Sequence, residues 1–253
     1  MRLREAGCPL VAFTEKPGAA RVQLNAYPAS RREAIALAHQ WGGTVLGVDV
    51  RQWLKAQPVL PTQIGTKLEI VHEESRGRKK PAMPQLHVPH GLAFGSGEHA
   101  TTSMLLRELT RRGDFTGTTV LDLGTGSGVL ALAARLFGAR KIVATDFDPD
   151  AVRTARQNEA LNFSEPLIRW RRGDVKKLTP KARYDLVLAN LFSGILEEAA
   201  PQISSSVAPG GELWLSGILK AQEAGVVTAY RKQGMKLIQA SRRGKWVMLK
   251  LRA

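Results

Sequence analysis

The stretch VLDLGTGSGVL, residues 120–130, is a strand-like run that leads into three alternate glycines and then into a helix of small residues. In doubly wound sheets, ligands bind at the carboxyl ends of the strands, and glycine there lets the backbone approach the ligand closely. Asp146 ends the next strand-like run, where its carboxylate can accept both hydroxyl protons of a ribose. Gly124, Gly126, Gly128 and Asp146 are therefore predicted to bind a nucleoside cofactor.

The glycine spacing distinguishes two classes of cofactor. A dinucleotide fingerprint requires G-x-G-x-x-G, whereas this segment reads G-x-G-x-G and carries Val129 where the third glycine of that fingerprint would stand. Asp122 is badly placed for a phosphate but well placed for a cation, because it can hold an ammonium group directly or through water. These points favour S-adenosylmethionine over NAD.

Around this stretch, the second half of the chain alternates strand and helix patterns with short connections. The predicted strands are Thr119–Leu123, Lys141–Asp146, Leu167–Arg171, Tyr184–Asn190 and Gly211–Ser216, and the predicted helices are Gly128–Phe137, Pro149–Asn162, Gly194–Val207 and Leu219–Gln233. Such alternation predicts a mostly parallel sheet with helices on both faces. The last predicted strands, Met235–Ala240 and Lys245–Leu251, are too close in sequence for a helical crossover, so they must form an antiparallel hairpin.

The first part of the chain predicts a smaller α/β module. Its predicted elements are a strand at Arg21–Ala26, a helix from a Ser30 cap to Trp41, and strands at Thr44–Val48 and Lys67–His72. Charges, prolines and a glycine follow, which is a typical linker composition. We therefore expect a small α/β domain at residues 1–72, a linker at 73–85 and the sheet domain at 86–253.

Composition limits the classes of protein and the partners. The 253 residues include 37 Lys and Arg against 22 Asp and Glu, a net charge of +15, which attracts anionic partners and allows a contact with RNA. Cys8 is the only cysteine, which excludes an internal disulfide and a thiolate metal cluster. His87 and His90 lie three apart with His99 further on, but Pro89 stands between the first two and no acidic residue is placed to orient that pair, so no metal site is expected. With neither a secretory signal nor a membrane span in the sequence, a cytoplasmic location is expected.

Three further segments carry a family resemblance. They are GLAFGSGEHATT at residues 91–102, Ala189-Asn190-Leu191, and GELWLSGIL at residues 211–219. With the glycine segment, they resemble the Rossmann-like, seven-stranded methyltransferases that use S-adenosylmethionine. More narrowly, residues 50–253 are similar to the ribosomal protein L11 methyltransferases. The resemblance implies a seven-stranded, mostly parallel sheet that ends in an antiparallel hairpin.

The resemblance also implies roles for individual residues. Phe94 and Thr102 would cover the cofactor, with Thr102 bonded to its methionine end and Gly124 lining the methionine. Asp174 would reach the adenine amino group, and Asn190 would close the site as the catalytic residue. From the pattern alone, Asn190 ends a predicted strand, so its amide is expected at the carboxyl edge of the sheet, where a substrate amine would arrive.

The expected function is transfer of a methyl group from S-adenosylmethionine to a protein amine. By the resemblance, the acceptor is a lysine or the N-terminal amine of ribosomal protein L11, recognised by residues 1–72. One alternative is a methyltransferase acting on another protein lysine or on RNA. Another is a non-catalytic module that binds S-adenosylmethionine or RNA.

Overall fold

The structure is a computed structural model that describes residues 10–14, 23–27, 31–42, 44–45, 61–72, 83–89, 97–180 and 182–253. The chain divides into two compact units, Met1–Pro58 and Val59–Ala253. The second unit thus starts before the expected linker, and residues 61–72 belong to it. Among the described residues, no helix has the length and apolar character needed to cross a lipid bilayer.

The first unit contains a two-stranded antiparallel sheet and one helix. Strands β1 (Leu10–Thr14) and β2 (Gln23–Tyr27) pair with each other, and helix α2 spans Arg31–Trp41. β2 and α2 correspond to predicted elements, whereas β1 was not predicted. Thr44 and Val45 are not in a strand, and the rest of the strand expected there lies outside the described residues, as does the Ser30 cap.

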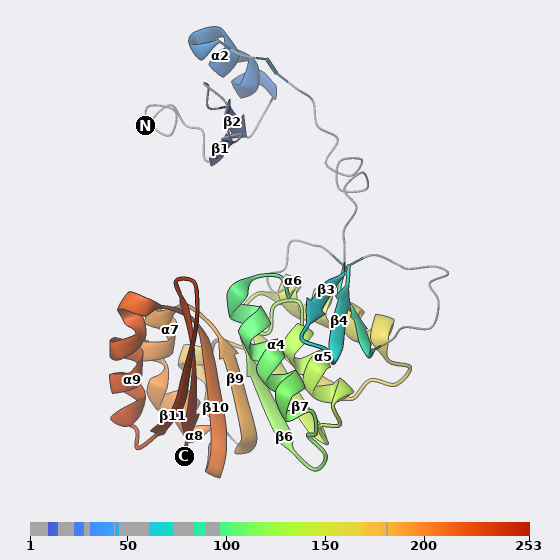
Figure 1. Ribbon diagram of the computed structural model, residues 1–253, viewed down its shortest axis with the longest axis vertical. Coiled ribbons are helices and arrows are strands. Elements are labelled where there is room, and N and C mark those ends of the chain that lie inside the picture. The colour runs from blue at the N-terminus through green and yellow to red at the C-terminus, as the bar shows by residue number, and fades with distance from the viewer. Residues whose placement is uncertain are drawn as a thin grey trace. The chain divides into compact units, whose positions relative to one another are not determined.

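The second unit is built on the predicted seven-stranded sheet, with the order β11-β12-β10-β9-β6-β7-β8 (Figure 1). The strands are β6 (Thr119–Leu123), β7 (Lys141–Asp146), β8 (Ile168–Arg172), β9 (Tyr184–Asn190), β10 (Val207–Leu219), β11 (Lys236–Arg243) and β12 (Trp246–Arg252). Strands β6 to β10 run parallel, while β12 is antiparallel to both β10 and β11. The fold class and the closing hairpin are confirmed.

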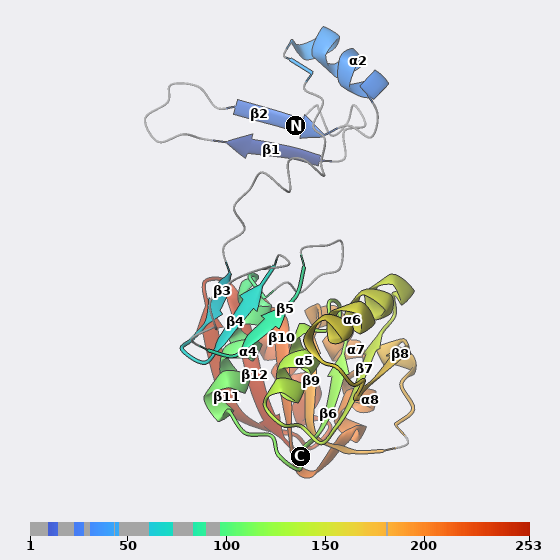
Figure 2. The same cartoon turned by 90° about the vertical axis from the view of Figure 1, so that its right-hand side faces the viewer.

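Helices cover both faces of this sheet (Figures 1 and 2). They are α4 (Ala100–Arg112), α5 (Val129–Leu136), α6 (Pro149–Asn162), α7 (Ser193–Glu198), α8 (Ala200–Ser205) and α9 (Glu223–Arg231), with 3-10 turns η1 (Val175–Lys177) and η2 (Lys220–Gln222). Asp148 caps α6 by accepting from the Asp150 N–H at 2.8 Å, and Pro149 follows as the first helical residue. This helix has the predicted bounds.

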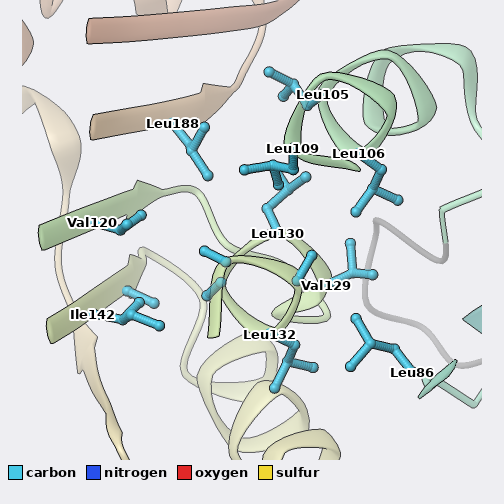
Figure 3. Packing of buried hydrophobic residues seen from close by; sticks show 14 of the residues in the cluster. Leu86, Leu105, Leu106, Leu109, Val120, Val129, Leu130, Leu132, Ile142 and Leu188 are labelled. Carbon is cyan, nitrogen blue, oxygen red and sulfur yellow. The ribbon is translucent and has the colours of Figure 1, made fainter. Parts of the chain in front are cut away.

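Strand alternation divides the interior into two cores. Leucines of α4 and α5 meet Val120, Ile142 and Leu188 on one face, and Leu86 contributes from the other side of α5 (Figure 3). On the opposite face, Leu121 and Leu123 pack with the residues of α7, α8 and α9. Asp122, two residues after Val120, therefore lies on the face of the sheet that α4 and α5 cover, where its neighbours Val120 and Leu188 are apolar.

Two predicted helices are wrong in extent. The expected helix Gly194–Val207 is two helices, α7 and α8, because Pro201 has no N–H to donate to the preceding turn. The expected helix Leu219–Gln233 begins later, because β10 continues to Leu219 and η2 precedes α9.

A second, three-stranded sheet and helix α4 were not predicted. The sheet contains β3 (Thr62–Ile64), β4 (Leu68–Val71) and β5 (Gln85–His87), of which only β4 matches a predicted strand. Ile64, Leu68 and Ile70 are fully buried in the same core as α4 and α5. This small sheet is part of the unit that holds the candidate site.

Candidate functional site

The three alternate glycines form the turn between β6 and α5. Gly124, Gly126 and Gly128 have φ values of +69°, +56° and +85°, a region that favours glycine. The N–H groups of Gly124 and Thr125 both donate to the carbonyl oxygen of Thr145, at 2.9 and 3.0 Å, which holds the turn against the end of β7. The turn lies at the carboxyl edge of the sheet, as predicted from the sequence.

Asp122 is the buried carboxylate of this turn. Its side chain has no exposed surface, and its Oδ2 accepts a hydrogen bond from Thr125 Oγ1 at 2.5 Å. Its Oδ1 is buried without a hydrogen-bond partner among the described residues. Burial raises the pKa of Asp122 to about 7, against the lowering effect of the Thr125 bond, and the nearby charge of Asp146 adds to the increase. A buried acceptor of this kind suits a cationic group, which would pair with the carboxylate.

Asp146 is held rigidly at the end of β7. Its Oδ2 accepts from the Gly126 N–H at 2.8 Å, and its Oδ1 accepts from the Asp148 N–H at 3.0 Å. Each carboxylate oxygen keeps a further lone pair, so the group can still accept two hydroxyl protons. In the β7–β8 register Asp146 pairs with Arg172, two residues before Asp174, and so Asp174 belongs to the same edge. Asp174 accepts from the Lys176 N–H at 3.0 Å and caps η1.

Asn190 and Thr102 meet, although 88 positions separate them in the sequence. Asn190 Nδ2 donates to Thr102 Oγ1 at 3.0 Å, which ties the end of β9 to the first turn of α4. Ser216 Oγ donates to the carbonyl oxygen of the neighbouring Thr101 at 3.1 Å, which ties β10 to the same turn. His99 caps this helix, because its Nδ1 accepts from the Thr101 N–H at 3.5 Å.

Leu191 links the two groups of predicted site residues. A Cβ at Gly124 would stand 2.3 Å from Leu191 Cδ2, and a Cβ at Gly217 would stand 2.3 Å from the Leu191 carbonyl oxygen. The Leu191 N–H donates to the Ser216 carbonyl oxygen at 3.1 Å. The segment after Asn190 is therefore clamped between the glycine turn and β10.

Gly128 has a packing reason for being glycine. A Cβ there would lie 2.8 Å from the Trp170 ring and 2.9 Å from the Ala155 methyl group. Because both neighbours belong to the core, a side chain at this position would disrupt the packing of α5 and α6 against the sheet. Its predicted contact with the cofactor stays a prediction.

The sequence-based prediction missed two residues at this edge and named one that cannot be placed. Phe94 lies outside the described residues. Phe147 was not predicted, yet its ring is 66% exposed directly after Asp146, where it can stack on a base. The signal in the sequence was the position of Phe147, an apolar residue between Asp146 and Asp148 at the end of a predicted strand. Leu191 was predicted only as part of the Ala189-Asn190-Leu191 motif. Its close contact with Gly217 could not be predicted, because the two residues are distant in sequence.

The chain is similar to known proteins over most of its length. Residues 32–253 match the family model described as ribosomal protein L11 methyltransferase. Two curated relatives named ribosomal protein L11 methyltransferase come from Geobacter metallireducens and Geobacter sulfurreducens. They are 39% and 40% identical to this chain, and each match covers 76% of the chain and 62% of the relative. The chain thus spans less than two thirds of the length of these relatives.

A solved structure shares both the fold and part of the sequence. The crystal structure of ribosomal protein L11 methylase from Lactobacillus delbrueckii subsp. bulgaricus is 29% identical, with a TM-score of 0.67. The match covers 76% of this chain and 97% of that one. Together with the sheet order, the glycine turn and the pairing of Asn190 with Thr102, these similarities show that the chain belongs to the ribosomal protein L11 methyltransferase family.

Proposed function

We propose that the protein is an S-adenosylmethionine-dependent methyltransferase that modifies lysines or the N-terminal amine of ribosomal protein L11 in the cytoplasm. The observation that supports this cofactor is Asp122, whose buried Oδ1 has no hydrogen-bond partner among the described residues and whose Oδ2 is bonded to Thr125 of the glycine turn. The family and the names of the curated relatives support the protein substrate. The first unit, Met1–Pro58, is proposed to recognise that substrate, since residues 61–72 of the expected domain 1–72 belong to the second unit.

The residues at the sheet edge fit this cofactor. Asp122 would pair with its ammonium group, Asp146 would accept from its ribose hydroxyls, and Asp174 would accept from the adenine amino group. Phe147 would stack on the adenine ring, and Thr102 would bind the methionine end. S-adenosylmethionine supplies an electrophilic methyl group on a sulfonium centre, so the protein has mainly to position a neutral amine.

Asn190 is proposed to orient that amine. With Nδ2 donating to Thr102, the amide is fixed and its Oδ1 can accept an N–H from the incoming nitrogen. A free lysine has a pKa of about 10.4, and desolvation lowers the pKa of an amine and favours its neutral form. Phe192 is 75% exposed two residues after Asn190, where a bound substrate would cover it and exclude water.

The function is tested by incubating the chain with radiolabelled S-adenosylmethionine and purified ribosomal protein L11. We expect label on L11 and formation of S-adenosylhomocysteine. Label on RNA in a total ribosomal extract but on no protein would instead support the RNA alternative. Tight cofactor binding without product in any such extract would support a non-catalytic binding module.

Asp122 should make cofactor affinity depend on pH. Its pKa of about 7 lies above the ordinary value of 3.8, so its contribution to stability falls as the pH rises between these values. A bound ammonium group favours the carboxylate, so binding must release a proton wherever Asp122 is protonated. We expect affinity to fall by about tenfold between pH 7 and pH 5.5, measured by calorimetry.

The matched control for this dependence is Asp122→Asn. This variant should bind the cofactor weakly at every pH and lose the dependence between pH 5.5 and 7. It should also melt at a higher temperature than the parent at pH 8, because a buried charge is gone. A pH dependence that persists in the variant would assign the titration to another group.

Asp146→Ala should weaken S-adenosylmethionine binding by about 1.5–3 kcal/mol, the range for deleting a charged hydrogen-bond partner. The backbone amides of Gly126 and Asp148 lose their acceptor but can turn to water, so the unit should stay folded. Calorimetric titration and circular dichroism check the two statements. Unchanged affinity in a folded variant would place the ribose elsewhere.

A further inference from the structure

The outer strand β8 presents arginines on one face. β8 lies at the end of the sheet and pairs only with β7 (Figure 2). Ile168 and Trp170 point into the core, whereas Arg169 and Arg171 are exposed. Because side chains alternate along a strand, these two arginines lie on one face, about 6.6 Å apart along the strand.

The basic character continues beyond the strand into η1 and up to the residue before β9. We define the basic edge as Arg169, Arg171, Arg172, Lys176, Lys177 and Arg183, all of which are exposed. Asp174 is the only acidic residue between positions 168 and 183, and its Oδ1 is engaged by the Lys176 N–H. Lys176 forms the single ion pair found for this edge among the described residues, a 3.4 Å contact with Glu198 in which both side chains are largely exposed.

Six basic side chains outside this edge form ion pairs among the described residues. Arg111 and Lys250 pair with Glu108, Arg135 with Glu159, Arg153 with Asp150, Arg242 with Glu223 and Arg252 with Glu212. At the basic edge, six basic side chains fall between positions 169 and 183, and one exposed ion pair is found for them. Edge protection needs charges on the outer strand itself, so it does not account for Lys176, Lys177 and Arg183, which lie beyond β8.

We propose that the basic edge binds the phosphate backbone of RNA. Guanidinium groups match phosphate oxygens in geometry and lose less hydration than ammonium groups on contact. A docked protein would need several apolar anchors, but Leu167 and Phe147 are the large apolar side chains exposed beside this edge among the described residues, and Phe147 is proposed to stack on the cofactor. An interface that is polar and strongly positive is typical of nucleic-acid binding instead.

The position of the basic edge makes it a docking surface and not a second acceptor site. Three interstrand steps, from β8 through β7 and β6 to β9, separate Arg169 and Arg171 from the strand that ends in Asn190, a distance of about 14 Å. Arg183 directly precedes that strand, at the end opposite to Asn190. RNA bound there would hold the enzyme on a ribonucleoprotein without entering the place proposed for the amine. This inference goes beyond the proposed function and does not depend on it.

The experiment measures fluorescence anisotropy of a labelled 20-nucleotide single-stranded RNA titrated with the full chain between 50 and 200 mM KCl, with no cofactor present. The test variant is Arg169→Gln, Arg171→Gln, Lys177→Gln, which leaves Arg172 in place beside Phe147. The control variant is Arg231→Gln, Lys232→Gln, Lys236→Gln, which removes the same charge from exposed positions near the opposite sheet edge.

We expect the test variant to bind RNA about tenfold or more weakly at 100 mM salt, with the slope of log affinity against log salt reduced by about 2. The control should change affinity by less than about threefold. Equal losses in both variants would assign binding to the overall charge and overturn the proposal, as would a parent chain that binds no RNA.

Two further outcomes would point to a protein partner. Polyglutamate that displaces the RNA at equal concentration, or a test variant that loses methylation of free L11, would overturn the RNA assignment. With RNA binding measured separately, failure of L11 methylation in the parent chain would contradict the proposed function alone.

Discussion

Replacing Asn190 by alanine should lower kcat for methylation of the protein substrate by about 100-fold or more, while cofactor affinity changes by only a few fold. The reason is that Asn190 is proposed to act on the incoming amine, and removal of one preorganised hydrogen-bonding group at a reacting centre typically costs about 10²–10³ in kcat. Steady-state kinetics with L11 and calorimetry with the cofactor measure the two quantities.

Thr102→Val is the matched control for this prediction. It keeps the shape of the side chain but removes the oxygen that accepts from Asn190 Nδ2. The Asn190 amide is still present but its orientation is no longer fixed, so we expect a smaller loss, about tenfold in kcat. The comparison is made at saturating cofactor, because Thr102 is also proposed to bind the methionine end. A normal kcat in a folded Asn190→Ala protein would show that the amide has no part in positioning the amine.

Removing residues 1–58 should leave a folded protein that binds S-adenosylmethionine but loses most methylation of L11. All the described cofactor residues, and both cores around the sheet, belong to the unit Val59–Ala253. The substrate would then have to be positioned without its proposed recognition module, which lowers the effective concentration of the amine at the site. The measurements are cofactor affinity by calorimetry and kcat/KM with L11.

A second truncation tests where the boundary between the two units lies. A chain that starts at Met83 matches the linker expected from sequence, but it lacks β3 and β4 with the buried Ile64, Leu68 and Ile70. Loss of such side chains costs about 2–5 kcal/mol each. This shorter chain should therefore melt well below the longer one. Undiminished kcat/KM in the chain from Val59 would remove the recognition role from the first unit.

The sequence predicted the parallel sheet well because local patterns determine it. β7, β9 and α6 have the predicted bounds, and each combines buried apolar residues with a clear terminus such as the Asp148 cap. The α7 and α8 pair shows the limit of such patterns. Its apolar spacing is continuous across Ala199, and only the missing N–H of Pro201 interrupts it.

The elements that the sequence did not predict depend on contacts between residues that are far apart in the sequence. β3 and β5 have three residues each, and their burial comes from the core shared with α4 and α5. Helix α4 begins with a histidine cap, which is not among the usual capping residues. In the site, the pairing of Asn190 with Thr102 and the clamp on Leu191 each join segments far apart in the chain, so spacing alone could not reveal either contact.

The place of β12 in the sheet has a consequence for the order of folding. β12 lies between β10 and β11, so β11 has no partner in the sheet until β12 has been synthesised. β7 and β8 pair with the preceding strand as they emerge. Two edges stay open for longer: that of β6 until β9 is made, and that of β10 until β12, which begins more than 25 residues later, is made. Such an exposed edge attracts other strands. A nascent chain halted before Trp246 should therefore be more prone to aggregation than one halted after Arg252.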